Sequence, residues 1–492
     1  MAQRSATLRG HEIPLDLLIG GEWVSADGRY AVTNPADGSV IAEPTSGGVE
    51  HALRALDAAA SVQAEWADWA PRARADLMHR AHRLLLEREA AFVETMTLES
   101  GKPLAESKGE FALSAAFFLW FAEQVAHLHG SYADGSNGGY RIIVGHRPVG
   151  PCYLVTPWNF PLLMSARKAG AALGAGCTVI MKTARDTPLT QALFAQVLHD
   201  AGFPAGVVNL IHTRETGDVS AAIMADARLR KVSFTGSTGV GSQLLGQAAP
   251  GIVNAAMELG GDGPFVVLDD ADVDLAVREA VACKFRNAGQ ACVAANRIIL
   301  HRDIAEEFTE KFVAAASRLR VGDGFAEGTE VGPVISDGQR RRVVELLDRF
   351  VGAGAEVLLG GRPVDGPGYF FEPTVLRLGR ERYDFCNEEM FAPVAALYTV
   401  DSTAEALAFA NDTSYGLAAY LFTRDISRAI VIGERLEFGM VGINRGIMSD
   451  PAAPFGGTKK SGLGREAGQE GVYEFLEPHY LALTVDEKGA LA

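Results

Sequence analysis

From residue 150 onward, short β-rich runs alternate with longer helical stretches, and this alternation constrains the fold more than any other feature. The runs CYLVT, TVIMKT, VVNLI and KVSFT are each followed by a stretch with the apolar spacing of a helix. Strands separated by helices form βαβ units, whose strands pair in parallel. The pattern therefore predicts an α/β protein with a Rossmann-like parallel sheet.

The 492-residue length predicts two to four domains. Residues 48–128 carry apolar side chains at helical spacing, and they are expected to join the first sheet region. We divide the chain into a first domain (1–128 and 147–260), a second α/β domain (261–460) and a small β arm (129–146 and 470–492). The arm segments read as strands isolated from the main alternation, so we expect them to pair with another subunit.

The composition excludes several classes of protein. Hydrophobic residues make up 48% and charged residues 22%, which is ordinary for a globular enzyme. The formal net charge of −16 repels nucleic acid and anionic membranes, so any acidic substrate must be held by locally placed cations.

The cysteines and the N-terminus indicate a reducing compartment. Five scattered cysteines form no disulfide framework and no pair with metal-ligand spacing. They are Cys152, Cys177, Cys283, Cys292 and Cys386. No stretch has the length of a signal peptide or a membrane span. We expect a cytoplasmic protein that binds no metal ion.

Three residues are candidates for catalysis, although each also has an ordinary structural interpretation. Cys292 follows an Asn-x-Gly-Gln turn, where a thiol can be accessible, but many cysteines are simply buried. Glu258 precedes a Gly-Gly pair and could act as a general base or be a solvated turn residue. Asn159 in TPWNFP could stabilise an oxyanion or cap a turn.

A glycine-rich turn indicates a phosphate-binding site. FTGSTGVG (234–241) runs from a predicted strand into a helix, and helix N-termini bind phosphate. Its Gly-x-x-Gly-x-Gly order is not the usual dinucleotide fingerprint, so alone it is weak. Lys182 ends the strand TVIMK, where it could contact a ribose or be solvated.

Taken together, the motifs resemble the aldehyde dehydrogenase superfamily. TPWNFP, FTGSTGVG, MELGG, FRNAGQAC, NEEMFAPV and APFGGTKKSGLGRE occur in that family's order and spacing, and the resemblance runs from about residue 19 to 485. It implies an aldehyde dehydrogenase fold with a cofactor domain, a catalytic domain and an oligomerisation arm. It also implies a homodimer or homotetramer.

The resemblance assigns roles to individual residues. It implies that Cys292 is the nucleophile, Glu258 the general base and Asn159 the oxyanion donor, with Lys168 and Glu466 relaying protons. The positions that match cofactor contacts are Thr156, Pro157, Trp158, Lys182, Arg185, Gly236, Ser237, Gly241, Leu259, Glu389 and Phe391. A Cys292 thiohemiacetal would lose hydride to NAD(P) and leave a thioester, which water hydrolyses. Glu258 favours water over coenzyme A as the acceptor.

Within the family, the C-terminal stretch GMVGINRGIMSDPAAPFGGTKKSGLGRE is most similar to succinate-semialdehyde dehydrogenases. That resemblance implies a substrate site of Arg167, Arg286, Ser449 and Phe455, in which two guanidinium groups and a hydroxyl bind a distal carboxylate. Either arginine could instead bridge a surface acid. Glutarate semialdehyde or another aldehyde remains an alternative substrate, and a non-catalytic structural relative is the alternative of a different class.

Four positions depart from the family pattern. Ala392 and Asp262 replace a common Gly and a common Lys, and Ala294 removes a second cysteine that forms a redox switch in some relatives. Arg185 stands where NAD-preferring relatives often carry Glu. Because an arginine attracts a 2′-phosphate and a glutamate repels it, we expect NADP to be preferred, with NAD also used.

Overall fold

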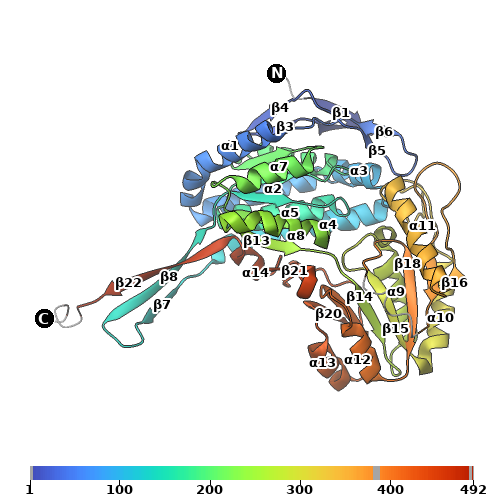
Figure 1. Cartoon of the computed structure of the whole chain (residues 1–492). Coiled ribbons are helices and arrows are strands. Elements are labelled where there is room, and N and C mark those ends of the chain that lie inside the picture. The colour runs from blue at the N-terminus through green and yellow to red at the C-terminus, as the bar shows by residue number, and fades with distance from the viewer. Residues whose placement is uncertain (1–3, 380–387, 487–489, 491–492) are drawn as a thin grey trace.

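The computed structural model describes residues 4–379, 388–486 and 490. Cys386 and the end of the predicted arm (487–489 and 491–492) lie outside the described residues. The described chain forms two α/β units side by side, from which a narrow β arm projects (Figure 1).

The first unit is built on an eight-stranded sheet. In spatial order its strands are β21 (Gly462–Leu463), β13 (Asn254–Glu258), β12 (Lys231–Thr235), β9 (Cys152–Val155), β10 (Val179–Lys182), β11 (Val208–Ile211), β3 (Leu17–Ile19) and β4 (Glu22–Val24). The five central strands are parallel, whereas β21 and the β3–β4 hairpin add antiparallel edges.

Both faces of this sheet are covered, so its strands are apolar throughout. Tyr153 and Ile180 face α1 (Val49–Asp68), α7 (Thr216–Ala225) and α8 (Thr238–Ala248), while Leu154 and Met181 face the opposite side. That second side holds α5 (Pro161–Ala175) and α6 (Leu189–Asp200), backed by α2 (Pro71–Glu87), α3 (Glu89–Ser100) and α4 (Leu104–Gln124). Burial on two faces explains the continuous apolar runs.

Helix α5 positions much of the site. Pro161 occupies its first turn and Gly176, at φ +93°, ends it. All fifteen of its residues are buried, including Arg167 and Lys168. A fully buried helix that carries two cations needs counter-charges within reach, and these come from another part of the chain.

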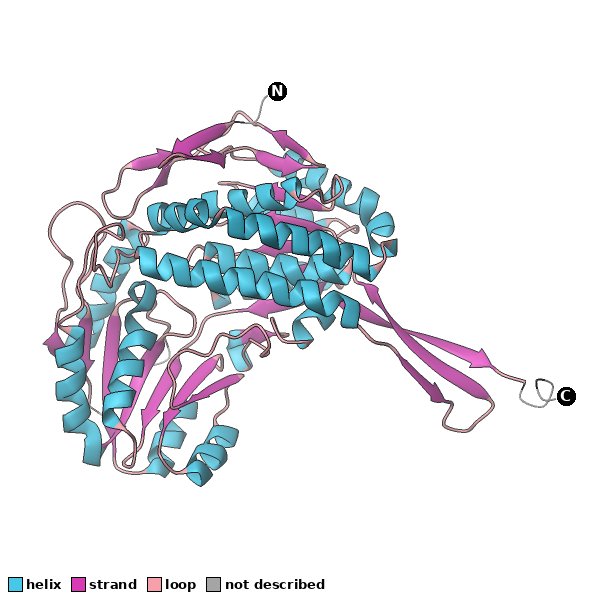
Figure 2. Ribbon diagram, turned by 180° about the vertical axis from the view of Figure 1, so that it is seen from behind, coloured by secondary structure: helices cyan, strands magenta, loops and turns pink. Residues whose placement is uncertain are grey.

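The second unit is a seven-stranded sheet. Its spatial order is β16 (Glu356–Leu359), β17 (Thr374–Arg377), β18 (Val394–Val400), β15 (Ala295–His301), β14 (Gly263–Val267), β19 (Ala418–Phe422) and β20 (Met440–Ile443). Helices α9 (Val273–Phe285) and α10 (Arg302–Ala316) pack on one face, and α11 (Asp337–Gly352), α12 (Thr403–Asn411) and α13 (Ile426–Arg435) on the other. Figure 2 shows the two units from behind.

The arm is a three-stranded antiparallel sheet of β22 (Leu476–Thr484), β8 (Tyr140–Pro148) and β7 (Ser131–Asp134). It joins two segments far apart in sequence and extends away from the body (Figure 2). The short helix α14 (Glu470–Tyr473) precedes it. No helix in the described ranges has the length and apolarity needed to cross a lipid bilayer.

The predicted α/β class with parallel Rossmann-like sheets is confirmed. The predicted runs CYLVT, TVIMKT, VVNLI and KVSFT become β9, β10, β11 and β12. The N-terminal segments also form two small hairpins, β1 (Ser5–Leu8) with β2 (His11–Pro14) and β5 (Val32–Thr33) with β6 (Val40–Ala42).

Candidate active site

The three predicted catalytic residues line one cavity of about 370 Å³ between the two units. Glu258 is the last residue of β13, Asn159 lies between β9 and α5, and Cys292 precedes β15. Asn159 and Glu258 lie at the carboxyl ends of strands of the first sheet, where ligand sites of α/β sheets form, whereas Cys292 lies at the amino end of β15. The structure therefore brings Asn159, Glu258 and Cys292 together from three separate segments.

The connection from β13 to β14 passes very close to the cysteine loop. A Cβ atom at Gly261 would collide with the carbonyl oxygen of Cys292, so only glycine allows this approach. The turn before Cys292 is held in an uncommon conformation, with φ of +53° at both Asn287 and Ala288. Such backbone strain commonly accompanies functional loops.

Burial raises the pKa values of both the Cys292 thiol and the Glu258 carboxylate. Burial, together with the charge of Glu258, raises the pKa of Cys292 well above its usual value. Burial also raises the pKa of Glu258 to about 7, against the opposing effect of the Arg167 charge. Near neutral pH the pair therefore retains a proton, and both groups line the same cavity.

Asn159 is buried, and its side-chain amide contacts the turn before Cys292. Its Nδ2 donates to the carbonyl oxygen of Gln290 at 3.2 Å, which ties it to the turn before Cys292. Its Oδ1 has no hydrogen-bond partner among the described residues. The amide thus reaches the cysteine loop, as an oxyanion donor requires.

Behind Glu258 lies a buried group of charges that includes both predicted relay residues. Glu466 contacts the Nζ atom of Lys168, which also donates to Ser233 Oγ at 3.0 Å. The same carboxylate lies 2.5 Å from Arg167 Nε. Arg167, predicted to bind substrate, is therefore already paired with the predicted relay acid.

Of the other predicted substrate residues, Phe455 lies against this group, Arg286 lies beside Phe160, and Ser449 has no contact with either arginine among the described interactions. The Arg167 guanidinium stacks 4.2 Å from the Phe455 ring centroid, and the Arg286 guanidinium lies 5.4 Å from that of Phe160. Arg286 makes no ion pair within the described part of the chain, and its Nε is buried without a partner. Ser449 is half-buried in the loop after β20.

A second cavity, of about 440 Å³, adjoins the first, since the two share Pro157, Trp158 and the 235–237 turn. Lys182 and Arg185 line it. Burial lowers the pKa of Lys182 to about 8, as expected for a cation without an acidic partner. Arg185 is exposed and pairs with no acid that the structure describes.

These residues fit a dinucleotide. Helix α8 begins at the 235–237 turn, and a Cβ atom at Gly241 would collide with the Leu259 side chain, so glycine permits close packing of helix and strand. Its N-cap Ser237 makes no capping hydrogen bond, which leaves N–H groups of the first turn available to a phosphate. Lys182 and Arg185, which line the same cavity, suit a phosphate group on the ribose of such a dinucleotide.

At the other end of the first cavity, Glu389 accepts from the Gly261 N–H at 3.3 Å, and burial raises its pKa to about 7. Trp158 and Phe391 make an edge-to-face contact, with ring centroids 5.4 Å apart. The joined cavities therefore extend from the Lys182 region past Glu389 to Cys292.

Comparison with known proteins matches residues 23–481 to the family model described as the aldehyde dehydrogenase family. The chain belongs to this family. It is 48% identical to a succinate-semialdehyde dehydrogenase of Paenarthrobacter nicotinovorans, over 90% of this chain and 98% of that protein. It is 42% identical to a glutarate-semialdehyde dehydrogenase of Pseudomonas putida, over 95% and 97% of the two chains.

A solved structure supports the same assignment. The chain matches an E. coli NADP dependent enzyme with a TM-score of 0.94 and 41% identity, covering 96% of this chain and 98% of that one. The aldehyde dehydrogenase fold and the NAD(P)-dependent oxidoreductase activity predicted from the motifs are therefore confirmed. The substrate class is that of the family, an aldehyde.

One departure from the family motifs, Asp262, has a structural explanation. Asp262 lies 2.9 Å from Arg297 Nε, and both side chains are fully buried. This member therefore places an acid where relatives often have Lys, and an internal arginine balances it.

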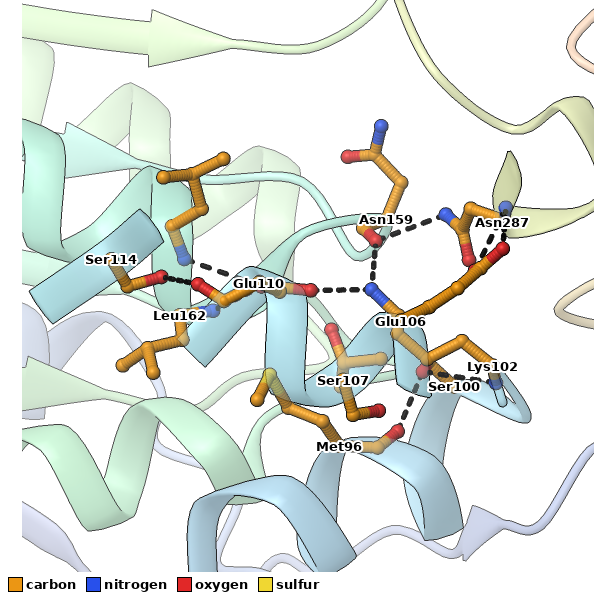
Figure 3. A network of polar contacts seen from close by, with 12 residues as sticks. Met96, Ser100, Lys102, Glu106, Ser107, Glu110, Ser114, Asn159, Leu162 and Asn287 are labelled. Carbon is orange, nitrogen blue, oxygen red and sulfur yellow. Dashed lines mark hydrogen bonds and ion pairs between the residues drawn. The ribbon is translucent and has the colours of Figure 1, made fainter. Parts of the chain in front are cut away.

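The sequence did not predict a cluster of charged residues that contacts the Asn159 peptide and the Asn287 turn. Lys102 donates to the Asn159 carbonyl oxygen at 2.7 Å, and Glu106 accepts from the Asn287 backbone N–H at 2.9 Å. Glu110 accepts from the first N–H groups of α5 (Figure 3). The four-residue spacing of Lys102, Glu106 and Glu110, at and just before the start of α4, is the sequence signal that could have revealed this group.

Proposed function

We propose that this aldehyde dehydrogenase oxidises succinic semialdehyde to succinate, with NADP as the preferred acceptor. The observation that carries the proposal is Arg286, six residues before Cys292 in the chain, which makes no ion pair among the described residues and whose Nε is buried without a hydrogen-bond partner. Two relatives are named for aldehydes that end in a carboxylate. A half-buried guanidinium that makes no ion pair, in an acidic protein, supports recognition of such a group.

In the proposed first step, the Cys292 sulfur forms a bond to the aldehyde carbon while Glu258 accepts the thiol proton. The carbonyl electron pair moves to oxygen, where Asn159 Nδ2 and the Cys292 backbone N–H stabilise the negative charge. When bound, the dinucleotide supplies a hydride acceptor, and hydride loss from the adduct leaves a thioester on Cys292.

In the second step, Glu258, once it has lost the thiol proton, accepts a proton from water as the water oxygen bonds to the thioester carbon. The carbon–sulfur bond then breaks, which releases the acid and returns the thiolate. The buried contact of Lys168 with Glu466 supports their proposed role as the route by which the proton on Glu258 reaches solvent. Glu466 is the most accessible member of this group, with a side chain 12% exposed.

The NADP preference rests on Arg185 and Lys182, which line the same cavity. An exposed guanidinium without an acidic partner would attract a 2′-phosphate, whereas a carboxylate would repel it. The resemblance to an E. coli NADP dependent enzyme supports the same preference. NAD remains a second acceptor, because nothing in this cavity would exclude a ribose 2′-hydroxyl.

The deciding experiment is an aldehyde panel run separately with NAD and NADP, followed by absorbance of the reduced nicotinamide. Succinic semialdehyde should give the highest kcat/KM, ahead of glutarate semialdehyde and far ahead of propanal. A preference for propanal would contradict the carboxylate site. Glutarate semialdehyde is the second candidate, because a 42% identical relative carries that name.

We also propose that the arm pairs with a second copy of the chain. Tyr132, Tyr480, Leu481 and Leu483 are at least 51% exposed on it, and its outer strands have unpaired edges. Large apolar side chains and free strand edges are both covered by association. Sedimentation equilibrium should give a dimer or tetramer, and a variant that ends at residue 475 should be monomeric.

A further inference from the structure

A buried lysine outside the family motifs contacts the peptide of Asn159. The Lys102 side chain is 1% exposed, and its Nζ donates to the Asn159 carbonyl oxygen at 2.7 Å. It also donates to a carboxylate oxygen of Glu110 at 2.5 Å and lies 4.5 Å from the Phe160 ring centroid. The ammonium therefore joins the Asn159 peptide to Glu110 of α4 (Figure 3).

Glu110 fixes the lysine relative to α5. Its other carboxylate oxygen accepts from the backbone N–H groups of Leu162 and Leu163, at 3.0 and 3.2 Å. These N–H groups belong to the first turn of a helix, where no intrahelical acceptor exists. The carboxylate thus holds the start of α5, which begins two residues after Asn159, and presents the lysine to the preceding peptide.

Asn287 holds the same carbonyl oxygen from the other side. Its Nδ2 donates to the Asn159 oxygen and to the Gln290 oxygen, both at 3.1 Å, while Glu106 accepts from its backbone N–H. The Asn159 carbonyl therefore has two donors, one from each unit. Its side-chain amide extends away from both of them (Figure 3), toward the cavity that holds Cys292.

We propose that Lys102 is a positioning residue for the oxyanion donor. It fixes the Asn159 peptide by a charge-assisted hydrogen bond and thereby aims the Asn159 amide at the developing negative charge on the substrate oxygen. This inference rests on the proposed role of Asn159. A donor is effective only when it is held in place before the charge develops, and a displacement of about 1 Å can cost roughly 100-fold in rate.

The Lys102–Glu110 pair also has a structural effect, because removing one partner leaves a buried charge unpaired. A loss of activity in Lys102→Met would therefore not suffice as a test. A double-mutant cycle with Asn159→Ala separates the two effects, since a residue that acts through the Asn159 amide has nothing left to position once that amide is removed.

The experiment compares wild type, Lys102→Met, Asn159→Ala and the double variant, with succinic semialdehyde and propanal as probes and saturating NADP. We expect Lys102→Met to lower kcat roughly 10- to 100-fold while the NADP dissociation constant stays within twofold. In the Asn159→Ala background the same change should cost less than twofold. Equal losses in both backgrounds would overturn the positioning role, whereas an unimpaired Asn159→Ala would overturn the proposed oxyanion donor itself.

Lys231→Met is the matched control. Lys231 is also fully buried, donates to Asn254 Oδ1 at 2.6 Å and lies 5.2 Å from the Phe475 ring centroid, but it begins β12, at the opposite end from the cavity. Lys231→Met should lower Tm and leave kcat within twofold of wild type. A decrease in kcat of Lys102→Met that is no larger than that of Lys231→Met would count against the proposal.

A crystal structure of Lys102→Met gives a readout that is independent of turnover. The Asn159 amide should be displaced while Glu258 and Cys292 keep their positions, and an unmoved amide would refute the inference. Should Lys102→Met fail to fold, Lys102→Gln retains a shorter neutral donor and takes its place in the cycle, with a smaller expected loss.

Discussion

The Nε atom of Arg167 lies 2.5 Å from a carboxylate oxygen of Glu466, and the arginine is fully buried. The same carboxylate contacts Lys168. Arg286, in contrast, has no ion pair among the residues described. The two arginines proposed to bind the substrate carboxylate are therefore in different electrostatic situations, and their variants should behave differently.

Arg286→Ala should weaken catalysis selectively for carboxylated aldehydes. Loss of one donor leaves the substrate carboxylate poorly paired, which costs ~2–3 kcal/mol, or roughly 30- to 150-fold in kcat/KM. Turnover of propanal should stay near that of wild type. Equal losses for succinic semialdehyde and propanal would contradict the proposed role of Arg286.

Arg167→Ala should slow both aldehydes. Removing this guanidinium takes away a partner of Glu466 and a positive charge that lowers the pKa of Glu258. Without that charge, the general base ionises only at higher pH. The measurement is the pH dependence of kcat with propanal, whose midpoint should move upward; an unchanged midpoint would separate Arg167 from the charged group behind Glu258.

Cys292→Ala should abolish aldehyde oxidation and leave cofactor binding intact. Loss of the nucleophile commonly costs several orders of magnitude in rate. The thiol lines the cavity next to the cofactor residues, but the fold does not depend on it, since its side chain is only half-buried. Turnover above ~1% of wild type, with NADP binding measured by fluorescence titration, would show that another group forms the adduct.

Glu258 should give a pH dependence to both rate and stability. Its pKa is raised to about 7 by burial, so kcat should rise as pH passes through 7, and Glu258→Gln should slow the reaction and remove that rise. A kcat that is constant from pH 6 to 9 in wild type would exclude the general-base role.

The pH dependence of stability should run opposite to that of the rate, because raising the pH through 7 ionises Glu258 and destabilises the fold. A carboxylate whose pKa is higher in the folded state stabilises the fold when protonated, and this contribution disappears as pH rises from the unfolded-state value through about 7. Above pH 8 the ionised group should cost on the order of 3 kcal/mol. Glu258→Gln should therefore raise Tm relative to wild type at pH 8.5 more than at pH 5.

Arg185→Glu should reverse the cofactor preference. Replacing the cation with an anion removes attraction to the 2′-phosphate and adds repulsion, so the ratio of kcat/KM for NADP to that for NAD should fall at least roughly ten-fold. Arg278→Glu makes the same change in net charge on an exposed arginine of α9 that lies outside the cofactor cavity. An equal change in the NADP-to-NAD ratio of kcat/KM in both variants would indicate an effect of the overall net charge rather than of Arg185.

The sequence could predict the parallel sheets because their strands and helices carry local, periodic signals. It could also place Glu258 at the end of a strand and Cys292 after a turn, where the structure has them. It could not reveal that Arg167 pairs with Glu466 or that Lys102 supports Asn159, because such partners come from segments far apart in sequence. The antiparallel edges β3 and β21 were missed because two or three residues carry no detectable period.

The return of the chain to its first sheet has a consequence for synthesis on the ribosome. Strand β21, which completes the edge beside β13, and Glu466, which compensates the charges of Arg167 and Lys168, both belong to the first unit. In the chain, both come after residues 263–443, which form the second sheet. A nascent chain that ends near residue 260 therefore holds two cations in an apolar helix without their acid, which disfavours stable packing. We therefore expect the first unit to pack stably only after translation has passed residue 466.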